Sequence, residues 1–241
     1  MDEPTALGDR LGAVVLGAGP GQTVVADSTS VILYKLLRAA LDGRPGRDEI
    51  VVDRDNFPTD RFLVEGIAAE RGARIRWIQA DPATGVRPDD VAAVVGPRTA
   101  VVLLSHVAYR SGFLADAPAI TALVHDAGAL VLWDLCHSAG SVPVELDAWD
   151  VDLAVGGTYK YLNGGPGAPA FGYVRAELQQ RIQQPIWGWM GAHQPFGMSP
   201  DYRPAEDVRR FLTGTPPILA MQPLKHMVEL IAEAGMDAVR E

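Results

Sequence analysis

The stretch "TAVVLLSHVAYRSGFLADAPAITALVHDAGALVLWDL", residues 99–135, contains two short apolar runs separated by a helical pattern. The runs at 99–106 and 129–135 are rich in Val and Leu and apolar on both faces, which is typical of strands covered by helices on both sides. Residues 116–128 between them begin at an aspartate and end at a glycine, as capped helices do. The stretch therefore predicts a strand–helix–strand unit with parallel strands.

The same alternation extends in both directions along the chain. Further strands are predicted at 23–27, 49–53, 74–80, 153–159 and 170–175, and further helices at 30–41 and 59–72. This order predicts an α/β fold, with a doubly wound, mostly parallel seven-stranded sheet as the middle of three α/β/α layers.

The pattern changes after residue 176, which predicts a boundary there. Residues 1–176 are expected to form the ligand-binding core of a large domain. Residues 177–241 are expected to add a long loop rich in Gly, Pro and aromatic residues, followed by a helix over 216–235. Loops of this length in compact proteins are usually functional or interfacial.

Composition narrows the possible partners. The chain has 241 residues, 48% of them hydrophobic, and a net charge of −9 without a basic cluster, which argues against nucleic acid and anionic membranes as partners. No apolar run approaches the roughly 18 residues of a membrane span, and the acidic N-terminus has no signal-peptide pattern. The single cysteine, Cys136, excludes an intrachain disulfide and a Cys-rich zinc site and fits the cytoplasm. A small neutral or amphoteric substrate is favoured.

Ligands of an open parallel sheet bind beyond the carboxyl ends of its strands, so the residues that follow each predicted strand are candidates for a site. In chain order these are Ser28, Thr29, Ser30, Phe57, Asp60, Ser105, His106, Tyr109, Arg110, Asp134, His137 and Lys160.

Most of these residues also have an ordinary structural explanation. Hydroxyl groups at 28–30 suit a phosphate at a helix start, but a plain N-cap is the commoner reason for them. Phe57 is compatible with a core position or with a platform that stacks on a ligand. Asp134 and His137 can be a cap and a hydrogen-bonded histidine, and no third residue at a suitable spacing favours a metal site. Cys136 is more easily explained as a small packed residue than as a nucleophile.

Lys160 is harder to explain structurally, because it lies between two tyrosines in "VGGTYKYLNGGPGAP" (155–169) before a Gly-rich loop. Partial burial there favours an amine that acts as a nucleophile. A phosphate-binding helix start, an aromatic platform, a buried carboxylate and a nucleophilic lysine together form the set that a pyridoxal phosphate enzyme needs. The lysine forms the Schiff base, and the aspartate keeps the pyridine nitrogen protonated.

The chain resembles the kynureninase family of fold-type I pyridoxal phosphate enzymes, within the aminotransferase superfamily. The resemblance lies in "DSTSVILYKLLRAAL", "DNFPTD", "LLSHVAYRSG", "DLCHSAG", "TYKYLN", "GWMGAH" and "RRFLTGTPPI". It implies that Lys160 is the Schiff-base lysine and that Tyr159 binds the phosphate and moves protons. It implies cofactor contacts from Thr29, Ser30, Phe57, Pro58, Thr59, Asp60, Ser105, Asp134, His137, Tyr159, Lys160, Trp189 and Thr215.

The resemblance also implies a partner and a reaction. Trp189 and Thr215 match positions that reach the phosphate from the other subunit, which implies a homodimer with shared active sites. The implied reaction is hydrolysis of the Cβ–Cγ bond of L-kynurenine or 3-hydroxykynurenine, a step of tryptophan catabolism, to L-alanine and anthranilate or 3-hydroxyanthranilate. Which of the two substrates is preferred stays open.

Two alternatives remain at this point. One is another fold-type I enzyme, cysteine desulfurase-like or epimerase-like, although Cys136 does not match the C-terminal loop position of a desulfurase cysteine. The other is a weakly active or non-catalytic remnant that binds the cofactor. The family's N-terminal arm and most of its small domain, which supplies an arginine for the substrate carboxylate, have no counterpart among these residues.

Overall fold

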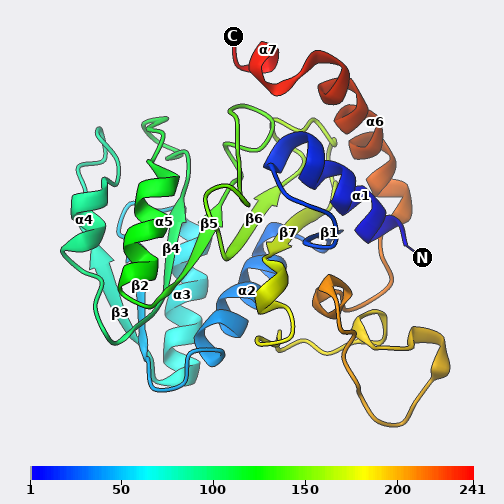
Figure 1. The fold of residues 1–241 in the computed structure, drawn as a ribbon, viewed down its shortest axis with the longest axis horizontal. Helices are drawn as coiled ribbons and strands as arrows, with labels where there is room; N and C mark the ends of the chain where they lie inside the picture. Colours follow the sequence, from blue (N-terminus) through cyan, green and yellow to red (C-terminus); the bar gives the residue numbers. More distant parts are fainter. Residues whose placement is uncertain (1) are drawn as a thin grey trace.

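A seven-stranded sheet forms the middle layer of the structure, a computed structural model that describes residues 2–241 (Figure 1). The spatial order of its strands is β1-β7-β6-β5-β4-β2-β3, and only β7 runs antiparallel to its neighbours. The predicted mostly parallel seven-stranded sheet is therefore confirmed. The strands are β1 (Thr23–Ala26), β2 (Glu49–Asp53), β3 (Arg74–Ile78), β4 (Thr99–Ser105), β5 (Leu130–Asp134), β6 (Leu153–Gly157) and β7 (Ala170–Val174).

The three predicted internal helices are present as α2 (Thr29–Asp42), α3 (Pro58–Arg71) and α5 (Ala117–Asp126). Each begins where the sequence offers a suitable first residue. Ser28 accepts a hydrogen bond from the Val31 N–H at the start of α2, and Asp116 caps α5 in the same way through the Ala119 N–H. Helix α3 begins at a proline and ends at Gly72, whose φ of +66° is left-handed.

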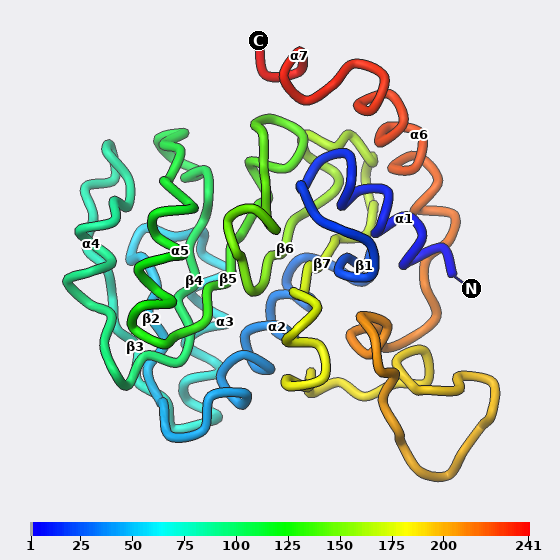
Figure 2. The backbone as a smooth tube through the Cα atoms, in the orientation of Figure 1, coloured from blue at the N-terminus to red at the C-terminus, as the bar shows by residue number. Residues whose placement is uncertain are grey.

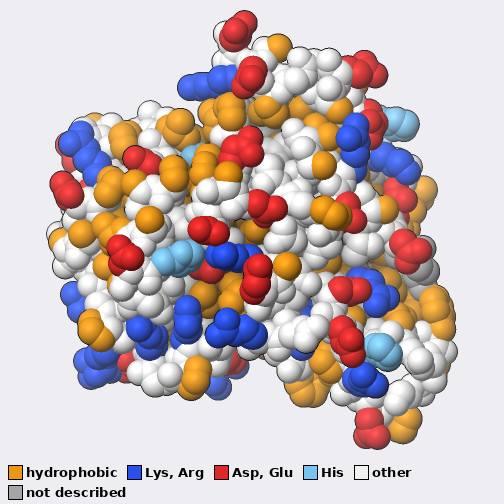
Figure 3. Space-filling model, viewed as in Figure 1, with side chains coloured by type: hydrophobic (Ala, Val, Ile, Leu, Met, Phe, Trp, Pro, Cys, Tyr) orange, Lys and Arg blue, Asp and Glu red, His pale blue; other side chains and the backbone are white. Residues whose placement is uncertain are grey.

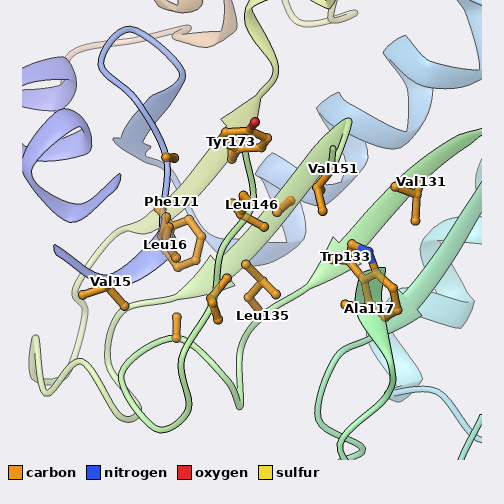
Figure 4. Close-up of a cluster of buried hydrophobic side chains, with 14 of the residues drawn as sticks. Val15, Leu16, Ala117, Val131, Trp133, Leu135, Leu146, Val151, Phe171 and Tyr173 are labelled. Carbon is orange, nitrogen blue, oxygen red and sulfur yellow. The ribbon is translucent and has the colours of Figure 1, made fainter. Parts of the chain in front are cut away.

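Helices cover both faces of the sheet because side chains of each strand alternate between two apolar cores. On one face, α2 and α3 pack on alternate residues of the central strands. On the other face lie α1 (Glu3–Leu11), α4 (Pro88–Ala92), α5 and α6 (Ile218–Ala234). Figure 4 shows part of this second core, with Trp133 of β5 beside Ala117 of α5, and Phe171 and Tyr173 of β7 beside Leu146.

The helix that the sequence predicts near the C-terminal end of the chain is present. Helix α6 falls within the predicted range 216–235 and is followed by the short α7 (Met236–Arg240). Figure 2 shows α6 running beside α1, and two exposed ion pairs, Arg10–Glu229 and Lys225–Glu3, join the two helices. Within residues 2–241 the structure has no helix with the length and apolar character that crossing a bilayer requires.

The segment 177–217 between β7 and α6 is irregular, with four short 3₁₀ turns (Ala176–Leu178, Trp189–Gly191, Pro195–Gly197 and Val208–Phe211). Part of it forms the projecting loop at the lower right of Figure 2. The fully buried Lys35 ties this segment to α2, since its Nζ lies 2.6 Å from Asp27 Oδ2 and 3.0 Å from the Phe211 carbonyl oxygen. The division of the chain at residue 176 stays a prediction.

Candidate active site

A pocket of about 240 Å³ lies at the carboxyl edge of the sheet. Residues that follow β1, β2, β5 and β6 meet in it, because the carboxyl ends of parallel strands share one edge. Its lining contains nine of the residues predicted to contact a cofactor: Thr29, Ser30, Phe57, Thr59, Asp60, Asp134, His137, Tyr159 and Lys160. Ser28, Leu33, Cys136 and Ala168 complete the wall.

Lys160 lies three residues beyond the end of β6 and is half-buried. Its Nζ is 3.0 Å from His137 Nε2 and 5.6 Å from the centre of the Phe57 ring. Burial, and then the nearby Lys160 charge, lower the pKa of His137, so its imidazole is neutral at neutral pH and Nε2 can accept a hydrogen bond from the amine. The lysine is therefore held at a defined place in the pocket by a neutral acceptor.

Two carboxyl groups, Asp60 and Asp134, lie at the bottom of the pocket and are at most 5% exposed. Asp134 Oδ1 accepts a hydrogen bond from the Cys136 N–H at 2.7 Å. Burial, followed by the Asp134 charge, raises the pKa of Asp60 to about 9. Asp60 Oδ2 is buried without a hydrogen-bond partner of normal geometry among the described residues. A cationic N–H group would therefore bind favourably beside Asp60 and Asp134.

The start of α2 also lines the pocket. Asp27 has a φ of +48°, which turns the chain from β1 into the helix. Because Ser28 supplies the N-cap, the hydroxyl groups of Thr29 and Ser30 are not needed for capping. The first N–H groups of a helix have no intrahelical partner and favour anions. This part of the pocket therefore suits a phosphate.

Phe57 lies on the pocket wall and not in the core. It is 39% exposed, and its ring meets the Tyr109 ring edge-on at 5.5 Å. An aromatic face at this place can cover a planar ligand, which favours the platform over the core position that the sequence left open. Tyr159, by contrast, is 53% exposed, at the mouth of the pocket.

Other predicted site residues do not line this pocket. Pro58 is the first residue of α3, and Ser105 lies in the wall of a neighbouring small cavity, where its hydroxyl donates to Asn56. His106 is buried and packs edge-on between Trp133 and Trp149, and burial lowers its pKa to about 4. His106 is therefore part of the core behind the site.

Trp189 and Thr215 lie on the irregular segment 177–217, away from the pocket of their own chain. Trp189 packs edge-on against Phe196 at 5.7 Å, and the neighbouring Trp187 stacks on Tyr202 at 4.9 Å. Trp189 lines a different, open pocket whose wall comes entirely from residues 187–203.

Comparison with known proteins agrees with this geometry. The family model for aminotransferase class-V matches residues 21–241. The chain belongs to the aminotransferase class-V family. It is 44% identical to a kynureninase of Burkholderia pseudomallei over 98% of its own length, and 41% identical to the kynureninase of Pseudomonas fluorescens over 97%. In both cases the match covers 56% of the relative, so the chain spans little more than half the length of these kynureninases.

Solved structures show the same fold at greater distance. A cysteine desulfurase from Thermococcus onnurineus superposes with a TM-score of 0.85 at 21% identity, covering 98% of this chain and 57% of that one. The Escherichia coli cysteine desulfurase CsdA gives 0.86 at 18% identity, covering 97% and 58%. At these identities the likeness establishes the fold alone.

The residues of the class-V chain fit pyridoxal phosphate, the cofactor that the resemblance to kynureninase implies. The unpartnered carboxyl oxygen of Asp60 beside Asp134 suits a protonated pyridine nitrogen, and the free start of α2 suits the phosphate. Lys160 lines the same pocket and suits the aldehyde.

Two residues that matter at this site were not among those predicted to contact a cofactor. Cys136 lines the pocket, where burial raises the pKa of its thiol and its Sγ accepts a hydrogen bond from the Gly157 N–H. Asn56 is buried directly before Phe57. An amide between a strand end and the first turn of a helix was the available signal, but an asparagine there is common in ordinary turns.

Proposed function

We propose that this chain is the cofactor-binding part of a pyridoxal phosphate-dependent hydrolase. Its reaction is cleavage of the Cβ–Cγ bond of L-kynurenine or 3-hydroxykynurenine by water, which gives L-alanine and anthranilate or 3-hydroxyanthranilate. The observation that carries the proposal is the meeting of Lys160 with the buried Asp60–Asp134 pair and the start of α2 in one pocket. The kynureninase relatives at 41–44% identity support the choice of substrate.

When bound, the cofactor supplies an aldehyde for amines and a ring that accepts electrons. Asp134 and Asp60 would hold the proton of its ring nitrogen, Phe57 would cover one face of the ring, and Thr29 and Ser30 would bind its phosphate. These residues would bind and orient the cofactor in the pocket that Lys160 also lines.

Lys160 and its neighbours would handle the protons. Lys160 Nζ binds the aldehyde and is the amine placed to take a proton from the α-carbon of the substrate. His137 is a neutral acceptor 3.0 Å from that nitrogen. It can orient the amine both for binding the aldehyde and for taking the proton. Tyr159 at the mouth of the pocket is placed to bind the phosphate and to pass protons to solvent.

The cysteine desulfurases with the same fold suggest a second reaction, but Cys136 argues against it. A persulfide-forming cysteine needs an accessible thiolate. Cys136 is 7% exposed, and burial raises the pKa of its thiol well above the usual range.

A spectroscopic experiment tests cofactor and substrate separately. Adding pyridoxal phosphate to the purified chain should give the visible absorbance band of a lysine-bound cofactor. Lys160→Ala should lack this band, and Lys225→Ala on the exposed side of α6 should keep it. Anthranilate fluorescence should then appear with L-kynurenine, and cysteine should release no alanine. Absence of the band contradicts cofactor binding, and a band without anthranilate contradicts the substrate.

The proposal includes a cytoplasmic homodimer that works in tryptophan catabolism. The exposed aromatic surface of the segment 177–217, including Trp187 and Phe196, is consistent with burial against a second copy. Trp189 and Thr215 would then reach the phosphate in the partner's pocket.

Subunit mixing tests this arrangement. Lys160→Ala and Trp189→Ala chains, each inactive or weak alone, are mixed after unfolding. If Trp189 acts on the partner's pocket, mixed dimers contain one intact site, and about a quarter of the wild-type activity returns. If Trp189 acts within its own chain, no activity returns, and the shared-site arrangement is wrong.

A further inference from the structure

Asn56 connects the cavity behind the sheet edge to the cofactor pocket. It is 3% exposed, between β2 and α3. Its Oδ1 accepts two hydrogen bonds, from the Ser105 hydroxyl at 2.6 Å and from the Phe57 N–H at 2.8 Å. Because both donors require an oxygen, they fix the orientation of the amide, and its Nδ2 must point the other way.

The nitrogen of this amide lies beside Asp60. Nδ2 is buried and has no hydrogen-bond partner of normal geometry among residues 2–241, and the same is true of Asp60 Oδ2. The Asn56 amide is nevertheless close enough to lower the pKa of the Asp60 carboxyl. Asn56 and Asp60 therefore interact, and each has a buried atom without a partner, one of them a donor and the other an acceptor.

The charged groups around Asp60 come from two other elements. Asp134 at the end of β5 raises the pKa of Asp60, and Lys160 after β6 lowers it. His137 and Cys136 face Asp134 and Lys160. Asn56 differs from all of these because it is neutral and cannot lose its donor when the pH changes. It can hold one oxygen of Asp60 whether or not the carboxyl carries a proton, which leaves the other oxygen to Asp134.

We propose that Asn56 is a positioning residue that holds the Asp60 carboxyl against Asp134, and that Ser105 acts on the site through Asn56 and not by touching the cofactor. The proposed coupling runs from the Ser105 hydroxyl through the Asn56 amide to the carboxyl groups of Asp60 and Asp134. The inference rests on the proposed function only for what the carboxyl pair binds. The positioning itself is a property of the cofactor-free chain.

The test measures the pKa of Asp60 by NMR of carboxyl-labelled aspartate in the cofactor-free full chain, with the signal assigned through Asp60→Asn. Asn56→Ala should raise the pKa of Asp60 by about 0.5–1 unit, because the charged form loses its donor. Asn56→Asp keeps an acceptor for Ser105 and Phe57 but removes the donor, so it should raise that pKa at least as much. Ser105→Ala, which removes one hydroxyl group, should give a smaller shift in the same direction.

Binding of pyridoxal phosphate gives a second measurement. Its dissociation constant should rise about 5–10-fold in Asn56→Ala and less in Ser105→Ala, in the same order as the pKa shifts. Gln222→Ala, which removes an exposed amide on α6, is the matched control and should change neither quantity. If Asn56→Ala does not fold, the same two measurements on Ser105→Ala and Asn56→Asp test the inference.

Two results would overturn the inference. One is an Asp60 pKa that is the same in wild type, Asn56→Asp and Ser105→Ala. The other is weaker cofactor binding in Ser105→Ala without any shift of that pKa, since a direct contact between Ser105 and the cofactor would produce it. If the pKa shifts are observed but no anthranilate forms, the positioning role of Asn56 is supported and only the proposed substrate is contradicted.

Discussion

Two buried aspartates on neighbouring strands of this sheet have opposite surroundings. Asp152, directly before β6, lies at the amino edge, and its Oδ2 accepts hydrogen bonds from His125 Nε2 at 2.8 Å and from the Val131 N–H at 2.9 Å. Asp134, the last residue of β5, lies at the carboxyl edge beside a second carboxyl group. The two are almost equally buried, at 4% and 5% exposure.

The difference separates a structural carboxylate from a binding one. Asp152 is satisfied by its own chain, with a histidine, a backbone N–H and the positive charge of Arg44 nearby. Lys and Arg side chains gather along this lower edge of the molecule in Figure 3. Asp134 faces Asp60, an arrangement that costs free energy until a cation joins it. A buried carboxyl group that faces a second carboxyl group at a strand end therefore indicates a ligand site more strongly than burial alone does.

The largest effect on stability is expected at the satisfied aspartate. Asp152→Ala leaves the His125 ring and the Val131 N–H without their acceptor, and it should lower the free energy of unfolding by about 3 kcal/mol. Urea unfolding measures this, with Asp126→Ala, exposed beside His125, as a control expected to change stability by less than about 0.5 kcal/mol. Affinity for pyridoxal phosphate should stay at the wild-type level. A loss of affinity equal to that in Asp134→Ala would show that Asp152 also contributes to cofactor binding.

Asp134→Ala should show the reverse pattern. Loss of the carboxylate beside the ring nitrogen should weaken pyridoxal phosphate binding about 100-fold, or about 2.7 kcal/mol. The free energy of unfolding of the cofactor-free chain should change by less than about 1 kcal/mol, because Asp134 no longer opposes ionisation of Asp60, and this gain offsets the loss of the Cys136 hydrogen bond. Absorbance titration and urea unfolding of the same sample give both values. A large stability loss with unchanged affinity would assign Asp134 a structural role.

The pH dependence of stability should follow Asp60. Its folded pKa of about 9 lies above the usual value of 3.8, so the folded chain holds this proton more tightly than the unfolded chain does. The contribution is complete below about pH 4 and is lost as the pH rises toward 9. Asp60→Asn should therefore be more stable than wild type at pH 8 in the absence of cofactor, and nearly equal to it near pH 4. Glu65→Gln, exposed on the same helix, should follow the wild-type curve at both pH values.

The smallest effect is expected at the other edge. The hydrogen bond to Asp152 raises the pKa of His125, so the stabilisation from this histidine is present below about pH 6.5 and is lost as the pH rises through its folded pKa. His125→Gln should cost somewhat less than about 1 kcal/mol at pH 6 and almost nothing at pH 9. His226→Gln, exposed on α6, should show no such dependence. A constant difference at all pH values would mean that His125 is bound as a neutral ring.

The sequence predicted the strand ends better than the contacts between them. Asp134 and Lys160 could be selected because each polar residue follows an apolar strand, and strand direction then places them at one edge. Ser105 and His106 satisfy the same rule, yet one donates to Asn56 and the other packs between two tryptophans. The rule gives the edge on which a residue lies, but the twist of the chain after the strand sets the direction of the side chain.

Residue patterns alone predict the order of strands and helices, the mostly parallel sheet and the set of chemical groups at its carboxyl edge, because apolar periodicity and capping residues are local properties. Only the tertiary structure decided that Asp60 faces Asp134, that Lys160 meets a neutral His137 and that Trp189 lies outside the pocket of its own chain. These features depend on distances between residues far apart in the chain, and on how strongly packing removes each charged group from water. The spacing of residues along one strand determines neither these distances nor the degree of burial.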